Sequence, residues 1–179
     1  MRSLQIFKIW GIPFKVHPYW FAILFLFSWS ISNQVNLTSG EIYNIKEAWL
    51  IGFLTSFFLL STIIFHEVLH TFVSLNQGVK IKNITFYFLG AVLQIEKDCQ
   101  TALGNIKISI VRPLLCFSTA LLLIFISNPT ESNEQIFTNI LNRVAILNLF
   151  LGFLNLIPIG SLDGGNLLKS TIWYFSGSK

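Results

Sequence analysis

The sequence is poor in charge: only 11% of its 179 residues are Asp, Glu, Lys or Arg, and just 8 of them are acidic. Soluble domains usually carry about 25% charged residues. Because 53% of the residues are hydrophobic, with 18 Phe and 5 Trp, a soluble globular enzyme could not cover its surface with polar groups. The same composition excludes intrinsic disorder, which requires little hydrophobicity and high charge. The mean hydropathy of +0.66 indicates a chain that lies in lipid.

Cysteine is also scarce, and so is clustered positive charge. The two cysteines, Cys99 in a polar stretch and Cys116 in an apolar run, are too few for a disulfide framework. The net charge of +4 comes from scattered residues, of which Lys80 and Lys82 are the nearest to a cluster. We therefore expect no nucleic-acid partner, since an excess of this kind in a membrane protein usually marks cytoplasmic loops.

Four apolar stretches approach the roughly 20 residues that a helix needs to cross a bilayer. They cover residues 16–31, 48–75, 106–126 and 136–159. The first follows Arg2, Lys8 and Lys15 and has no small-x-small cleavage site, which favours a retained span over a signal peptide. Between the second and third, β-branched and aromatic residues from Val79 to Val92 predict two short strands. We therefore expect an all-α membrane protein of about four transmembrane helices, with a short membrane-associated β-strand segment between the second and the third.

Lysine and arginine are distributed unevenly around these stretches. They gather before the first stretch, between the second and third, and in the tail, whereas residues 127–135 contain neither. The positive-inside rule then predicts that the N-terminus, the middle loop and the tail are cytoplasmic. The second and fourth stretches would both run toward the cytoplasm, so that their ends lie at the same depth.

The second stretch closes with His66-Glu67-Val68-Leu69-His70, which holds two of the 3 histidines in the chain. This spacing puts both imidazoles on one face of a helix, as two ligands of one Zn²⁺ require, and places Glu67 beside a metal-bound water. The alternative is an accidental HExxH at a solvated helix end. The motif follows an apolar run, where these side chains would be costly to desolvate without a partner. That cost favours the zinc site.

Catalytic zinc usually has a third protein ligand. The candidates are His17, at the start of the first stretch, and Asp163, in an Asp-Gly-Gly segment after the fourth. An ordinary turn would also contain such an Asp, but the predicted topology brings Asp163 to the depth of the HExxH and so favours it. Asn155, just before Pro158, could donate to a developing oxyanion or hydrogen-bond between helices. The sequence leaves these two roles equally open.

Taken together, these features resemble the site-2 protease family of intramembrane zinc metalloproteases. The likeness is to its bacterial and cyanobacterial subgroup, which includes the sporulation pro-sigma-factor processing proteases. It covers nearly the whole chain: the opening over residues 11–20, the HExxH, the strand segment that ends at Val92, and Asn155 to Gly165. The last of these is similar to the motif Asn-x-x-Pro-x-x-Pro-x-Asp-Gly.

We expect residues 1–179 to form a single site-2-protease-like catalytic domain, without a CBS or PDZ domain. The resemblance implies cleavage of a single-span membrane substrate, for example an anti-sigma or pro-sigma factor, in a bacterial cytoplasmic membrane or a cyanobacterial thylakoid membrane. The active site would face the cytoplasm. The implied site residues are the zinc ligands His66, His70 and Asp163, the general base Glu67, and the substrate or oxyanion contact Asn155.

Three residues depart from the family pattern. Leu69 stands where a Gly usually precedes the second histidine, Arg112 replaces the Gly of an Ala-Gly-Pro motif, and Ser161 replaces the second Pro of the distal motif. We expect the Arg112 side chain to extend toward cytoplasmic water, so that Arg112→Gly would be neutral or stabilising. The leading hypothesis is a zinc endopeptidase. The alternatives are a pseudoprotease that binds membrane segments without cutting them and, least favoured by the single ligand cluster, a metal carrier.

Overall fold

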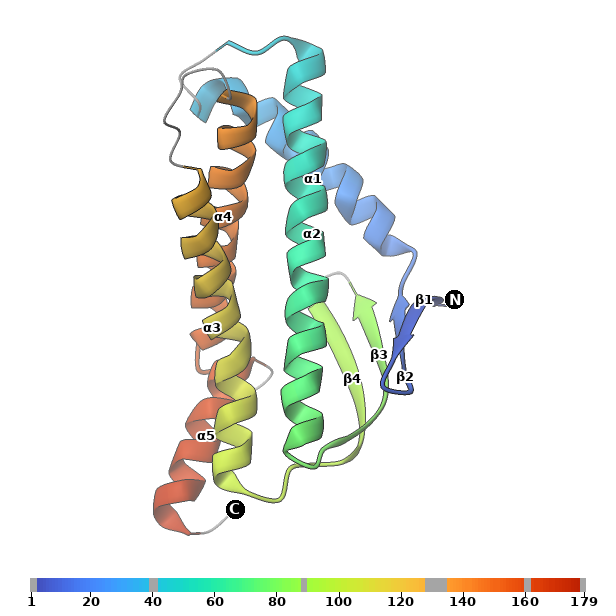
Figure 1. Ribbon diagram of the computed structural model, residues 1–179, viewed down its shortest axis with the longest axis vertical. Helices are drawn as coiled ribbons and strands as arrows, with labels where there is room; N and C mark the ends of the chain where they lie inside the picture. The colour runs from blue at the N-terminus through green and yellow to red at the C-terminus, as the bar shows by residue number, and fades with distance from the viewer. Residues whose placement is uncertain (1–2, 39–41, 88–89, 128–134, 160–161, 178–179) are drawn as a thin grey trace.

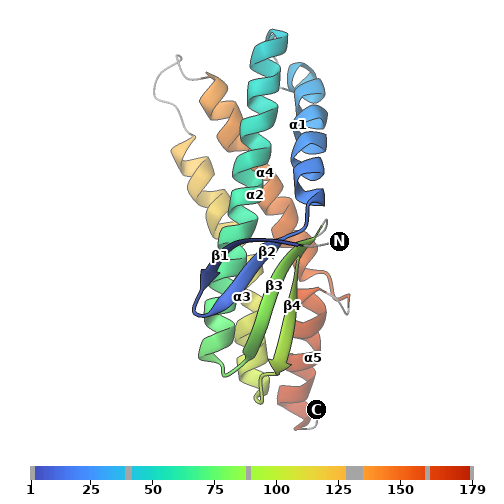
Figure 2. The same ribbon diagram turned by 90° about the vertical axis from the view of Figure 1, so that its right-hand side faces the viewer.

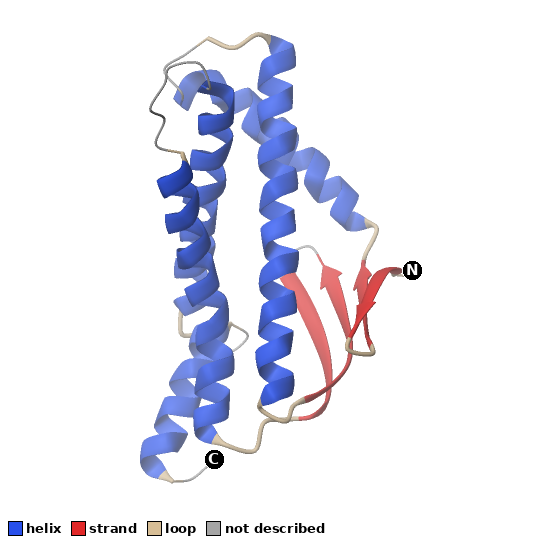
Figure 3. Ribbon diagram, in the orientation of Figure 1, coloured by secondary structure: helices blue, strands red, loops and turns tan. Residues whose placement is uncertain are grey.

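A computed structural model describes residues 3–38, 42–87, 90–127, 135–159 and 162–177 (Figure 1). In the described chain the elements follow in the order β1 (Leu4–Ile9), β2 (Ile12–Val16), α1 (Tyr19–Thr38), α2 (Ile45–Asn76), β3 (Lys80–Tyr87), β4 (Gly90–Lys97), α3 (Ala102–Ile126), α4 (Gln135–Leu156) and α5 (Asp163–Ser176). The strands form one sheet to one side of the helices (Figure 3). Phe88 and Leu89 of the expected strand segment and Ser161 lie outside the described residues.

Helix α2 is the longest element and the axis of the fold (Figure 1). It begins at a capping box, in which Asn44 Oδ1 accepts from the Glu47 N–H and Glu47 Oε2 accepts from the Asn44 N–H, each at 3.0 Å. Its 32 residues extend about 48 Å, which exceeds the roughly 30 Å of a bilayer's hydrocarbon core. The carboxyl-terminal half of α2 lies beside the sheet (Figure 2).

Three helices among the described residues are long and apolar enough to cross a membrane: Ile45–Asn76, Ala102–Ile126 and Ile136–Leu156. They correspond to the second, third and fourth expected spans. Helix α1 takes the place of the first, but Asn33, Gln34 and Asn36 make its second half polar, and it is not among these three. A fourth transmembrane helix therefore stays a prediction.

The sheet has the strand order β1-β2-β3-β4. Strands β3 and β4 form the antiparallel pair expected between the second and third spans, and β2 joins β3 in parallel. The β1–β2 hairpin was not expected. Its turn consists of Trp10 and Gly11, with φ of 50° and 80°, and two positive φ values are what a two-residue hairpin turn requires. Strand β4 is left at an edge of the sheet.

The sheet packs against α1 and α2 through a buried apolar cluster. Phe14, Ile84 and Phe86 are fully buried there and contact side chains of both helices. Trp20 Nε1 of α1 also donates to the Tyr87 carbonyl at 2.9 Å. Val68, in the middle of the HExxH turn, packs against the same cluster. The sheet therefore holds one face of this turn, and the motif's histidines and glutamate contact other elements.

Candidate metal centre

The HExxH lies in α2 and its polar side chains are buried. His66, Glu67 and His70 are 2%, 2% and 6% exposed. His66 Nε2 lies 3.0 Å from Thr119 Oγ1, and its Nδ1 lies 3.5 Å from Cys116 Sγ, both in α3. By contrast, both ring nitrogens of His70 are buried without a hydrogen-bond partner among the described residues.

Asp163 is the first residue of α5 and is 6% exposed. Its position follows from the chain's course after Leu156, where α4 ends two residues before the helix-breaking Pro158. An acid in the first turn is favourable, since this end of a helix carries partial positive charge. Burial raises the pKa of the Asp163 carboxyl above its ordinary value, and the neighbouring Arg112 guanidinium acts in the opposite direction.

Arg112 connects Asp163 to the HExxH. Its Nη1 donates to Asp163 Oδ2 at 2.6 Å, and its Nη2 donates to Glu67 Oε2 at 2.7 Å. The expectation that Arg112 extends toward water is therefore wrong: the side chain points into the site and is 23% exposed. The physical reason is that two buried carboxylates offer a guanidinium more than partial hydration does.

The remaining two candidates are His17 and Asn155, and they differ in how near they lie to the HExxH. The ring of His17 packs against those of Tyr19 and Tyr87, at 4.5 and 5.7 Å between centroids. Its backbone N–H donates to a carbonyl of β3. The Asn155 side chain hydrogen-bonds with Cys116, the same thiol that approaches His66. Asn155 therefore borders the HExxH through α3, whereas His17 belongs to the end of the sheet.

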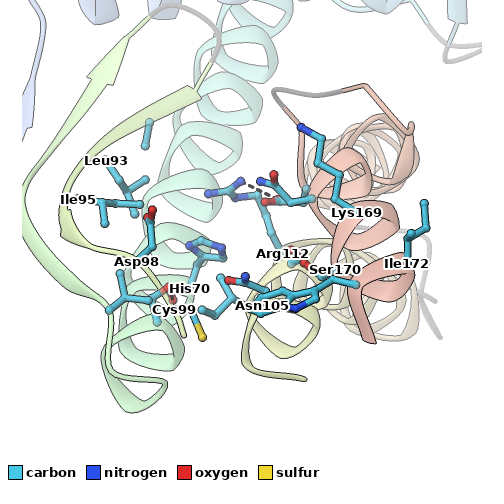
Figure 4. A pocket seen from close by; sticks show the side chains of 18 residues that line it. His70, Leu93, Ile95, Asp98, Cys99, Asn105, Arg112, Lys169, Ser170 and Ile172 are labelled. Atoms are coloured by element: carbon cyan, nitrogen blue, oxygen red, sulfur yellow. Dashed lines mark hydrogen bonds and ion pairs between the residues drawn. The ribbon is translucent and has the colours of Figure 1, made fainter. Parts of the chain in front are cut away.

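A cavity of about 770 Å³ opens beside these groups. Edge strand β4 contributes Leu93 and Ile95 to one wall, and α5 forms the opposite wall (Figure 4). His70, Arg112 and Asp163 lie along it. A segment entering this cavity would meet the edge of the sheet and the candidate site together.

Comparison with known proteins gives one family. Residues 123–179 match the model of Peptidase family M50. A Synechocystis sp. protein, sll0528, provisionally named a zinc metalloprotease, is 31% identical over 99% of this chain and 46% of its own length. Zinc metalloprotease MJ0392 of Methanocaldococcus jannaschii is 31% identical over 95% of this chain and 45% of its own length. The solved structure of a site-2 protease from the same organism superimposes with a TM-score of 0.64 at 28% identity, covering 97% of this chain and 73% of that one. The chain carries a peptidase M50 (site-2 protease) domain.

The chain spans about half the length of the curated relatives it matches. The helices, the small sheet and the order in which they occur agree with the site-2 protease fold.

The donor atoms of the candidate site are of the kinds that zinc binds, but their arrangement in the described part of the chain is not that of a metal site. Two imidazoles and a carboxylate are a donor set that zinc accepts, and a metal bond would satisfy one of the two partnerless ring nitrogens of His70. Within the described residues, however, no three His, Cys, Asp or Glu side chains are gathered as a metal site. Arg112 donates both to Glu67 of the HExxH and to Asp163, and so bridges the two parts of the candidate site.

Three residues of the site, all on α3, were not predicted from the sequence as site residues. Arg112, Cys116 and Thr119 contact the HExxH or Asp163. They stand at positions i, i+4 and i+7, and so share one helix face. The buried Ser109 continues the same stripe. A polar stripe on an otherwise apolar helix was the available signal.

Gly164→Ala should weaken the packing of α5 against the end of α4. A Cβ at Gly164 would overlap the backbone of Leu156 and Ile157, so α5 would have to shift and take Asp163 with it. Overpacking of this kind costs about 1–3 kcal/mol, and each kcal/mol lowers the midpoint of thermal unfolding by about 2–4 °C at this size. We expect a fall of several degrees in detergent. Asn166→Ala, at an exposed position of the same helix, is the control; equal midpoints for the two variants would contradict the close approach.

Proposed function

We propose that the protein is an intramembrane zinc metalloprotease that cleaves a transmembrane or membrane-associated substrate. The observation that carries the proposal is the meeting of the HExxH of α2 with Asp163 of α5 around one guanidinium, beside a cavity bounded by a strand edge. The names of the relatives support the same reaction class. We propose residues 1–179 as one catalytic domain.

In this proposal His66, His70 and Asp163 hold the zinc ion. Bound zinc would supply Lewis acidity, which makes water a better nucleophile and a carbonyl a better electrophile. Glu67 accepts the proton of the attacking water and returns it to the leaving nitrogen. Its Oε1 is buried without a hydrogen-bond partner among the described residues, which suits a group that must take up a proton. Asn155 would donate to the developing oxyanion.

The substrate would enter as an extended segment. We propose that it pairs with β4, as a strand added to a sheet edge. Two features support this: β4 is an edge strand in the order β1-β2-β3-β4, and its side chains line the cavity that contains His70 and Asp163. A single-span membrane protein, for example an anti-sigma or pro-sigma factor, would have to unwind locally to take this conformation.

The sheet and α5 would face the cytoplasm of a bacterial cytoplasmic or thylakoid membrane. The prediction is tested by labelling with a membrane-impermeant maleimide. Ile42→Cys, at a position 98% exposed between α1 and α2, should be labelled in intact cells. Lys82→Cys, exposed on β3, should be labelled only after the membrane is opened. The unchanged protein is the control, because its own two cysteines are 2% exposed. Labelling of Lys82→Cys from outside would contradict the orientation.

A second candidate function is a pseudoprotease that binds membrane segments without cleaving them. The ion pairs of Arg112 favour it, because they already neutralise the carboxylates that zinc and catalysis would need. The experiment that separates the two uses the purified chain in detergent, in which zinc per folded chain and cleavage of a model single-span substrate are measured together. Stoichiometric zinc with cleavage supports the protease. Substrate binding without cleavage supports the pseudoprotease, and absence of both would contradict the two proposals.

A further inference from the structure

Arg112 makes two ion pairs at the candidate metal centre, one with Glu67 and one with Asp163. One guanidinium reaches from α3 to Asp163 of α5 and Glu67 of α2. Figure 4 shows Arg112 at the cavity beside α5. Glu67 and Asp163 are 2% and 6% exposed. Their carboxylates are therefore poorly hydrated, and they would repel one another without a cation between them. Arg112 supplies that cation from within the chain.

Zinc in the proposed site would serve the same carboxylates. It would bind Asp163 directly and lie beside Glu67, so the metal and the guanidinium need the same small region. Two like charges a few ångströms apart repel strongly where water is scarce. A guanidinium that donates to Asp163 also uses an oxygen that could otherwise bind the metal. The two cations therefore compete.

We propose that Arg112 and zinc exclude one another at this site. In the metal-free protein Arg112 holds Glu67 and Asp163 together, and zinc can bind only when the side chain has left them. The cavity can accommodate the displaced Arg112 side chain, because Arg112 already lines it and Asp98 faces the cavity from the β4 side (Figure 4). Arg112 thereby sets both the zinc affinity and the availability of Glu67. This inference rests on the proposed function, because it takes His66, His70 and Asp163 as the ligands.

The test is the zinc dissociation constant of the full chain in detergent, measured by competition with a chelator. Arg112→Gly removes the side chain, and Arg112→Gln keeps most of its length without the charge. Both should bind zinc at least about tenfold more tightly than the unchanged protein, because one competing charge is lost. Arg143→Gln is the matched control: Arg143 lies in another apolar helix and donates to the Val35 carbonyl at 3.4 Å. It should leave the affinity unchanged.

A second measurement does not depend on zinc. In the presence of a chelator, Asp163→Asn should lower the midpoint of thermal unfolding of the unchanged protein by more than it lowers that of Arg112→Gln. The reason is that only the unchanged protein has an ion pair to lose. This measurement tests the ion pair on which the inference depends, even if Arg112→Gly fails to fold. Equal losses in both backgrounds would overturn the ion pair and the inference with it.

The outcomes separate the inference from the proposed function. Tighter binding in both Arg112 variants supports the inference. If the unchanged protein binds no zinc and the variants do, the inference is also supported, and the natural chain is a pseudoprotease. Equal, measurable affinity in all proteins overturns the inference and leaves the zinc site standing. Absence of zinc binding in every protein overturns the zinc site itself, and the inference falls with it.

Discussion

Glu67→Gln should abolish cleavage of a single-span substrate while the protein keeps its zinc and its fold. The amide has nearly the same shape as the carboxylate, and in the metal-free protein its oxygen can still accept from Arg112 Nη2, which lies 2.7 Å from Glu67 Oε2. What it cannot do is take a proton from water. A general base contributes about 10²–10⁴-fold to a rate, so cleavage should fall to background. Zinc per folded chain and the amount of uncut substrate are measured on the same preparation.

Glu47→Gln provides a matched control for this change. Glu47 lies in the first turn of the same helix, where its side chain accepts from the Asn44 N–H in the capping box, and an amide oxygen can do the same. This variant should cleave like the unchanged protein. Two results would count against the role of Glu67. Loss of zinc from Glu67→Gln would make Glu67 a ligand or a structural partner, and equal, negligible cleavage by the unchanged protein and the variant would favour the pseudoprotease.

The long helices could be predicted because one property identifies them. An apolar run of about 20 residues has few alternatives to a membrane helix, and α2, α3 and α4 were found where such runs occur. The β3–β4 pair was predicted for a similar reason, since glycine-punctuated β-branched and aromatic residues are a local signal. The HExxH was placed at the end of α2 by its position after an apolar run. Each of these features depends on residues close together in the chain.

The β1–β2 hairpin and α5 were missed because their signals are weak or compete with stronger ones. The residues before the first apolar stretch were interpreted through their positive charges, although the turn at Trp10 and Gly11 separates two short strands there. Helix α5 begins at the Asp-Gly-Gly, for which an ordinary turn was the alternative interpretation. Two glycines argue against a helix by propensity, but Gly164 is required there by the close approach of α5 to the end of α4.

Arg112 could not be placed from the sequence because its environment depends on three helices at once. Alone on an apolar helix, an arginine is expected to extend toward water. Glu67 and Asp163 stand 45 and 51 residues away in the chain, and only the packing of α2, α3 and α5 brings them to one guanidinium. This departure from a family glycine therefore lies at the centre of the candidate site.

Removal of any one proposed ligand should empty the metal site. We expect His66→Ala, His70→Ala and Asp163→Ala each to weaken zinc binding by more than about 100-fold, since changes to residues that only support a ligand already cost about 10–100-fold. Zinc affinity is measured on the folded fraction after size-exclusion chromatography in detergent. This step matters because Asp163→Ala also removes one partner of Arg112. His17→Ala is the control: it removes the third histidine of the chain, whose ring lies against Tyr19 and Tyr87 at the end of the sheet. This variant should bind zinc like the unchanged protein. If His17→Ala lost the metal and Asp163→Ala kept it, the third ligand would be His17, and α5 would have no part in the metal site.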